Sequence, residues 1–225
     1  WSPDMDEIKE LINKYSNYNY GFFETYELGK KTLQYNFHGG AEWMGGATDQ
    51  INNIMYVTSN NILWEAEVIL NSLDKNNIPK YSSSFKRVFS KEGYPAIKPP
   101  WGTLTAINLN DGKTIWQVPF GEYEELTKKG LSLTGTENFG GATVTSGDII
   151  IATGTLDKKL YIFNSSNGKI IYNLELPYVG SSPPTTYMVN NEQYILVHAT
   201  GGSSLKSGYP NLVEQGNKLI ALKLK

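Results

Sequence analysis

Short apolar runs separated by turn residues dominate this chain of 225 residues. The clearest stretch is residues 134–172. It holds a Gly-Gly pair, two apolar runs, a turn, a third apolar run and an Asn-Gly turn. Apolar runs of this length between turn residues are typical of antiparallel β-strands. The stretch therefore predicts one four-stranded antiparallel sheet.

The same pattern recurs along the chain at a regular spacing. Gly112 and Gly168 are 56 positions apart, and so are Trp116 and Tyr172. Two Gly-Gly-Ala-Thr stretches begin 95 positions apart, and the excess of 39 is about the length of an irregular segment at residues 65–100. Four-stranded units repeated at this scale indicate a β-propeller, whose blades bury their faces against one another.

We therefore expect an all-β fold, a partial β-propeller of about three four-stranded antiparallel blades with a short N-terminal helix. Residues 1–38 are predicted as a helix, over residues 3–15 and capped by Ser2, followed by an irregular extended arm. The blades are predicted at residues 39–118, 134–177 and 180–225.

Three connecting segments complete this prediction. Residues 65–100 are rich in Lys, Asn and Ser and end in Pro-Pro, so they are expected to be a long loop insertion in the first blade. Residues 122–129 are predicted as a short helix, and residues 203–216 as a polar loop. A strand at residues 62–64 is assigned to the first blade.

Composition and charge limit the classes of function. The formal net charge of −2 gives no electrostatic basis for binding nucleic acid or an anionic membrane. Because cysteine is absent, disulfides, thiolate metal sites and a catalytic thiol are excluded. No apolar run is long enough for a transmembrane helix, and the chain begins at Trp1 without the pattern of a signal peptide. We expect a mature segment or a fragment of a longer protein.

Residues 106–116, AINLNDGKTIW, resemble the tryptophan-docking motif of the eight-bladed quinoprotein dehydrogenases. In that family an Ala, a turn Gly and a final Trp lock adjacent blades together. The second copy here is degenerate, with Ile162 and Tyr172 in place of Ala and Trp. Residues 39–47, 98–109 and 134–141 resemble the C-terminal half of the glucose dehydrogenases that depend on pyrroloquinoline quinone (PQQ).

The resemblance implies a periplasmic enzyme that uses PQQ and calcium to oxidise a sugar or alcohol hydroxyl. Hydride would pass to PQQ, and electrons onward to a membrane quinone or cytochrome. In the family the general-base Asp, the Trp stacked on the cofactor and most calcium ligands lie in earlier blades, so no catalytic or metal-binding residue is assigned to this chain. We expect the chain to be inactive by itself, and whether it binds PQQ alone is left open.

Three pairs of residues are candidates for contact with the cofactor. In a propeller, ligands bind over the central channel, near the residues at which the innermost strands begin. Glu42 and Trp43 precede such a strand, Asn138 and Phe139 precede the Gly140-Gly141 pair, and Thr200 and Gly201 end a strand of the last blade. The alternative for each is structural: a loop carboxylate, a docking aromatic, or a glycine where the backbone bends.

The two histidines are predicted to be structural. His38 and His198 are 160 positions apart and neither has a partner at metal-ligand spacing. His198 lies in an apolar strand, so a hydrogen-bonded core position is expected.

Two further possibilities concern partners and function. Three blades cannot close a ring, so their exposed apolar faces are expected to be covered by the N-terminal helix and arm, by the missing propeller half or by self-association. A non-catalytic propeller module for binding or assembly is the alternative to part of an enzyme.

Overall fold

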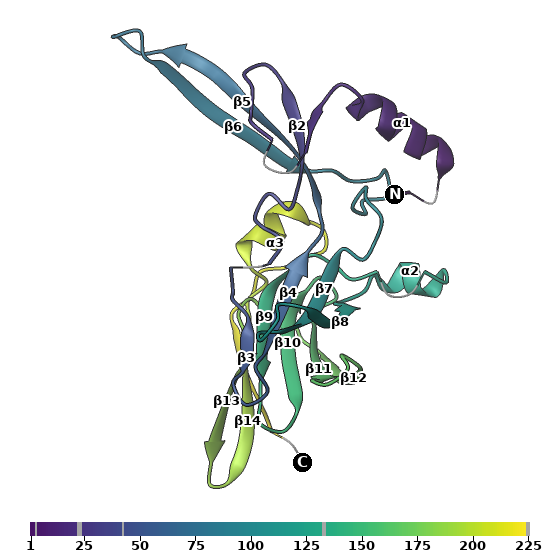
Figure 1. Cartoon of the computed structure of the whole chain (residues 1–225), viewed down its shortest axis with the longest axis vertical. Coiled ribbons are helices and arrows are strands. Elements are labelled where there is room, and N and C mark those ends of the chain that lie inside the picture. Colours follow the sequence, from purple (N-terminus) through teal and green to yellow (C-terminus); the bar gives the residue numbers. More distant parts are fainter. Residues whose placement is uncertain (3, 22–23, 42, 132–133, 224–225) are drawn as a thin grey trace. The chain divides into compact units, whose positions relative to one another are not determined.

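The structure, a computed structural model, describes residues 1–225 apart from residues 3, 22–23, 42, 132–133 and 224–225. The chain forms two compact units, one of residues 1–40 and 61–98 and the other of residues 41–60 and 99–225 (Figure 1). The first unit therefore contains most of the segment that the sequence assigned to a loop insertion.

The first unit consists of one helix on a four-stranded sheet. Its elements are α1 (Met5–Tyr15), β1 (Asn19–Tyr20), β2 (Lys31–Tyr35), β5 (Leu63–Leu73) and β6 (Pro79–Arg87), with the strands in the order β1-β2-β5-β6. The predicted helix is confirmed, but its N-cap is Asp4, whose side chain accepts a hydrogen bond from the backbone of Asp6 at 2.9 Å. Tyr15 packs against a small core that includes Leu33 and Leu63.

The predicted loop over residues 65–100 is wrong, because β5 and β6 form a long hairpin that extends beyond β2 (Figure 1). Past Val68 both strands are exposed, so burial leaves no apolar pattern in the sequence, and backbone pairing holds the two strands together. Asp74 shapes its turn by accepting hydrogen bonds from the backbone of Asn76 at 2.7 Å and of Ile78 at 2.9 Å. The extended arm also contains a strand, β2.

The second unit consists of three antiparallel sheets, which we call blades A, B and C. Blade A has the order β3 (Ala47–Asp49), β4 (Ile54–Asn60), β7 (Gly102–Asn108) and β8 (Thr114–Pro119). Blade B has β9 (Asn138–Val144), β10 (Ile149–Thr155), β11 (Lys159–Asn164) and β12 (Ile170–Glu175). Blade C has β13 (Thr185–Val189), β14 (Glu192–Ala199) and β15 (Lys218–Lys223).

Two short helices complete this unit. α2 (Glu124–Lys128) confirms the predicted short helix. α3 (Ser203–Gly208) lies in the segment predicted as a loop, so that prediction is wrong. The predicted strand at residues 62–64 does not belong to blade A, because Leu63 and Trp64 begin β5 of the first unit and the third strand of blade A is β7. None of the helices among the described residues is long and apolar enough to cross a membrane.

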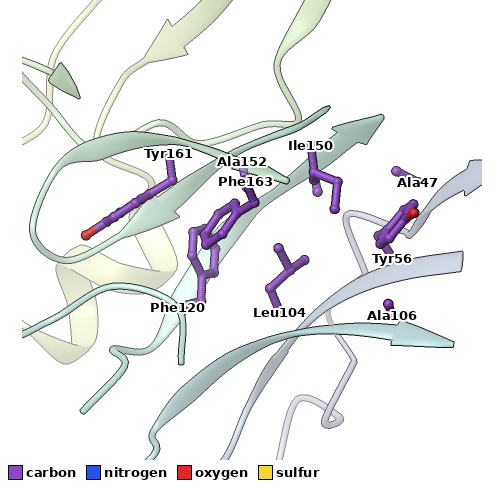
Figure 2. Close-up of a cluster of buried hydrophobic side chains, with 10 residues drawn as sticks. Ala47, Tyr56, Leu104, Ala106, Phe120, Ile150, Ala152, Tyr161 and Phe163 are labelled. Atoms are coloured by element: carbon purple, nitrogen blue, oxygen red, sulfur yellow. The ribbon is translucent and has the colours of Figure 1, made fainter. Parts of the chain in front are cut away.

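Blade B is buried on both faces. Ile150 packs toward blade A, in a core with Tyr56, Leu104 and Phe163 (Figure 2). Ile151, the next residue, belongs to a separate core that blade C completes with residues such as Val197 and Ile195. Consecutive strand residues point to opposite faces of a sheet, so one apolar run contributes to both interfaces.

Trp116 joins blade A to blade B. Its indole Nε1 donates a hydrogen bond to the backbone oxygen of Ser165 at 3.0 Å. Gly168 lies against the same ring, because a Cβ on this residue would lie 2.7 Å from Cε3 of Trp116. Gly168 also has a φ of +70°, which a glycine adopts without steric cost. The turn of blade B therefore needs glycine for two reasons.

We predict that Gly168→Ala lowers the free energy of unfolding more than Gly112→Ala. Gly112 occupies the equivalent turn of blade A with a φ of +71°, and nothing lies within 4 Å of its Cβ position. Both variants should lose about 1 kcal/mol to the left-handed backbone. Gly168→Ala should lose a further ~1–3 kcal/mol, because the methyl group displaces Trp116. Urea unfolding of both variants measures the difference, and equal losses would contradict the close packing of Gly168 against Trp116.

Candidate functional site

The three inner strands β3, β9 and β13 begin at one end of the blades, which we call the inner-strand rim. Gly141 of β9 marks their convergence. A Cβ on Gly141 would lie 3.2 Å from Cβ of Met44, just before β3, and 2.9 Å from Cγ of Pro183, just before β13. Gly141 has a φ of +79°. Glycine thus lets the chain of blade B pass close to the leading segments of both neighbouring blades.

Asn138, the first residue of β9, is fully buried, with 0% of its surface exposed. The side chain of Asn60, at the end of β4, pairs with the backbone of Asn138 in the way that a neighbouring strand would. Asn60 Nδ2 donates to the carbonyl of Asn138 at 2.9 Å, and the backbone N–H of Asn138 donates to Asn60 Oδ1 at 2.9 Å. Asn138 Nδ2 also donates to Asn60 Oδ1 at 2.8 Å. This clasp holds the start of β9 against blade A.

The side-chain oxygen of Asn138 is a buried acceptor without a hydrogen-bond partner among the described residues. An unsatisfied buried polar atom costs about 1–3 kcal/mol, so such atoms usually meet a water molecule or a ligand donor. Phe139, the next residue, is buried as well. The start of β9 thus combines an apolar ring with one free acceptor.

Trp43 differs from these residues because 76% of its surface is exposed. It directly precedes Met44, which lies close to Gly141, so Trp43 lies next to the rim with its side chain available to a ligand. Glu42, the other candidate on this segment, lies outside the described residues. Trp43 is therefore the candidate whose exposure suits direct contact.

Thr200 and Gly201 follow β14 and pack against the segment that leads into β13. The hydroxyls of Thr200 and Ser181 form a hydrogen bond, and the backbone of Gly201 donates to the carbonyl of Val179 at 2.9 Å. Gly201 has a φ of +87°, and a Cβ there would lie 2.0 Å from the carbonyl oxygen of Glu214. Close backbone packing accounts for this glycine.

His198 lies near the end of β14, where its backbone carbonyl accepts a hydrogen bond from the backbone of Ser181 at 2.9 Å. The prediction that His198 is a core residue is wrong, because His198 is exposed and pairs with Leu219 on the outward face of blade C. His38 lies in the first unit, where its ring contacts Trp64 edge-on at a centroid distance of 4.8 Å. The described residues contain no cluster of three or more His, Asp or Glu side chains that could hold a metal ion.

Sequence reasoning missed a polar network that also lies at this end of blade B, around Asp157 in the β10–β11 turn. Asp157 accepts hydrogen bonds from Thr155 Oγ1 at 2.5 Å, from the hydroxyl of Tyr161, and from the backbone of Glu122 at 3.1 Å. Lys159 pairs with Glu122 at 3.0 Å. The network ties the loop after β8 to blade B. Its only sequence signal was a short Leu-Asp-Lys-Lys stretch, which resembles an ordinary charged turn.

The network changes the proton affinity of its acids in opposite directions. Burial raises the pKa of Asp157, against the opposing effects of the Thr155 and Tyr161 hydrogen bonds and of Lys159. Burial and the neighbouring carboxylate also raise the pKa of Tyr161. The hydrogen bond from Lys159 lowers the pKa of Glu122. The folded protein therefore binds the Asp157 proton more tightly than the unfolded chain does.

We predict that the natural protein gains stability relative to Asp157→Asn as the pH falls. Because the pKa of Asp157 is raised from 3.8, its stabilising contribution is fully present below 3.8 and is lost as the pH rises through the raised pKa. Denaturant unfolding at several values between about pH 7 and about pH 4 measures this difference. Asp111→Asn, in the exposed β7–β8 turn, controls for the loss of one acid. A difference that is constant with pH, or that reverses, would contradict the assignment.

Comparison with known proteins identifies the class of this fold. The family model of the glucose/ethanol/alcohol dehydrogenase β-propeller domain, named PQQ, matches residues 3–195. The chain therefore belongs to this family of quinoprotein dehydrogenases, which confirms the resemblance seen in the sequence. The intact enzymes of this class use PQQ and calcium.

Individual relatives agree with this assignment. The chain is 30% identical over 189 residues to a quinate/shikimate dehydrogenase (quinone) of Acinetobacter baylyi, covering 72% of this chain and 23% of the relative. It is 27% identical over 148 residues to quinoprotein glucose dehydrogenase A of Acinetobacter calcoaceticus, covering 64% and 18%. The chain thus spans about a quarter or less of the length of these relatives.

A solved structure shows the same fold. A europium-containing methanol dehydrogenase superimposes with a TM-score of 0.66 at 17% identity, covering 88% of this chain and 36% of the other. This likeness confirms the partial propeller with its antiparallel blades.

The rim fits one side of a PQQ molecule, which is a planar quinone with carboxylates and a ring N–H. The exposed side chain of Trp43 suits stacking on a plane, whereas Asn138, with 0% of its surface exposed, presents no atom to a ligand. Carboxylates require cations, but Lys159, near this end, is paired with Glu122. The described residues supply no metal cluster. The chain fits part of a cofactor wall and not a complete site.

Proposed function

We propose that this chain forms the C-terminal part of the propeller of a PQQ-dependent dehydrogenase that oxidises a sugar or alcohol hydroxyl. In this proposal the inner-strand rim is part of the wall of the cofactor funnel. The supporting observation is the convergence of three inner strands at Gly141, beside the exposed Trp43. Function is assigned from this local geometry together with membership of the family.

Each rim residue has a distinct role in the proposal. Trp43 packs against the plane of the cofactor, and Asn138 holds the start of β9 in place through its hydrogen bonds with Asn60. Phe139 supplies an apolar floor that excludes water. Thr200 and Gly201 hold the neighbouring edge of the funnel through their bonds to the segment before β13. Bound PQQ supplies the hydride acceptor for oxidation of the substrate carbon.

The rest of the enzyme supplies what these residues do not. In this proposal the general base and the calcium ligands belong to blades outside residues 1–225, so the chain is inactive alone. The names of the relatives, which include quinate/shikimate and glucose dehydrogenases, support a hydroxyl-bearing substrate. A name ending in "(quinone)" supports a quinone as the electron acceptor. The family resemblance supports a periplasmic location, which fractionation of the cells tests.

We predict that Trp43→Ala weakens PQQ binding by the intact enzyme, meaning this chain together with the rest of its propeller. Loss of an aromatic stacking surface should cost about 1–1.5 kcal/mol, or roughly a tenfold rise in Kd. Titration of the apoenzyme with PQQ measures the Kd. Ile51→Ala is the control, because Ile51 is 84% exposed in the β3–β4 turn at the opposite end of blade A.

Two results would contradict this role of Trp43. An unchanged Kd in Trp43→Ala would exclude its contact with the cofactor. An equal rise in both variants would show that any exposed apolar side chain of blade A has the same effect.

A further inference from the structure

The first unit contains an apolar cavity between α1 and its sheet. Its volume is about 300 Å³, at the lower end of the range for small-molecule sites. Helix α1 forms one wall with Leu11 and Tyr15, and the sheet forms the facing wall with Leu33 and Leu63. All of these residues lie outside the inner-strand rim, so the cavity is separate from the proposed cofactor wall.

The lining of this cavity is uncharged. Every described residue around it is Leu, Ile, Val, Ala or Tyr. A sugar, quinate or PQQ carries several hydroxyl or carboxylate groups, and burying such groups without polar partners costs free energy. The cavity therefore suits an apolar molecule with few oxygen atoms, and neither the substrate nor the cofactor of the proposed reaction.

A tyrosine hydroxyl is available to one oxygen of such a molecule. Tyr20 and Tyr35 both line the cavity, and the hydroxyl of Tyr20 donates a hydrogen bond to that of Tyr35 at 3.3 Å. A tyrosine hydroxyl can donate and accept at once, so Tyr35 retains its own proton for a second partner. The hydrogen bond with Tyr20, together with burial, raises the pKa of Tyr35 to about 12, so this proton stays in place at neutral pH.

The cavity opens beside an apolar stripe on α1. Ile12 lines the cavity, yet 64% of its surface is exposed. Met5 is 66% exposed and lies roughly two turns earlier on the same face of the helix. Exposed apolar side chains that adjoin one another are typical of binding sites. A ligand with an apolar chain can place the chain along this stripe.

We propose that this cavity binds a quinone with an apolar tail, which serves as the electron acceptor of the enzyme. The ring occupies the cavity, a ring carbonyl accepts the hydrogen bond of Tyr35, and the tail lies along Ile12 and Met5. This inference rests on the proposed function, in which a quinone takes up the electrons. Reduction of the bound quinone to its hydroquinone takes two electrons and two protons. Oxidation of one substrate hydroxyl to a carbonyl releases the same number.

Binding to the intact enzyme without PQQ tests the site independently of turnover. The probe is a decyl-substituted benzoquinone, and titration calorimetry measures its Kd. Tyr35→Phe should raise the Kd roughly three- to tenfold, because it removes one hydrogen bond between neutral groups. Tyr81→Phe is the control, since Tyr81 is 57% exposed on β6 and does not line the cavity.

A second variant tests the position of the tail. Ile12→Glu places a carboxylate where the tail lies, at an exposed position of α1. The Kd of the decyl quinone should rise roughly tenfold, because the carboxylate loses water when the tail covers it. The Kd of the same quinone without its tail should change less. Asn13→Glu adds the same charge at the next residue, which is exposed and does not line the cavity, and is the control.

Kinetics of the intact enzyme with PQQ connect the site to electron acceptance. The KM for the decyl quinone should rise in Tyr35→Phe and in Ile12→Glu by about the same factors as the Kd. The rate with a soluble dye as acceptor measures oxidation of the substrate without the quinone, and it provides the reference for each variant.

The outcomes separate this inference from the proposed function. PQQ-dependent activity with the dye, together with a quinone Kd and KM that neither variant changes, overturns the cavity site and leaves the proposed function standing. Weaker quinone binding by both variants of a protein without PQQ-dependent activity supports the quinone site and contradicts the function. Binding of a decyl chain without a ring as tightly as the quinone, with no effect of Tyr35→Phe, assigns the cavity to apolar chains in general and overturns the proposal.

Discussion

The packing of blade upon blade is the interaction on which the second unit depends. Ile150 and Ile151 are adjacent and fully buried, yet they belong to two different cores. Burial of each such side chain contributes about 1.5–3 kcal/mol, and blade B gains this contribution on both faces only while blades A and C are present. Removal of either neighbouring blade would expose the face of blade B that packs against it. Stability is therefore shared between blades, as it is between the units of other repeat folds.

The candidate site is a consequence of that packing. Gly141 lies close to Met44 and Pro183 because the blades meet face to face, and Asn60 then fixes the start of β9 by bonding to the backbone of Asn138. Asp157 joins the loop after β8 to the same end of blade B. The rim is thus held by interactions between blades, and its residues are arranged before any ligand binds. Preorganisation of this kind reduces the free-energy cost of ordering these residues when a ligand binds.

Much of this fold could be predicted from the sequence, because its information is local. Apolar alternation and Asn-Gly or Asp-Gly turns define blades A and B, and the repeat of 56 residues identifies Gly112 with Gly168, and Trp116 with Tyr172, as equivalent positions of the two blades. The β5–β6 hairpin escaped prediction because its exposed strands carry no apolar period. α3 escaped because its six residues hold a single buried apolar side chain, Leu205.

The site was less predictable, because it is formed by contacts between residues distant in sequence. Asn60 and Asn138 are 78 positions apart, and neither has a local motif that signals a clasp. Asp157 looks like an ordinary turn acid until Tyr161 and the backbone of Glu122 are seen around it. His198 was expected in the core because its strand is apolar, but alternation points it to the open face of blade C. Sequence indicates which residues begin the inner strands, whereas only the fold shows which of them are exposed.

We propose that this chain is a cofactor-facing part of an enzyme whose chemistry needs further blades. The most direct measurement is the rate of PQQ- and calcium-dependent oxidation of glucose and of quinate by residues 1–225 alone and by the intact enzyme. We predict no turnover by residues 1–225 and PQQ-dependent turnover of a hydroxyl-bearing substrate by the intact enzyme. Turnover by residues 1–225 alone, or an intact enzyme whose activity is independent of PQQ, would contradict it.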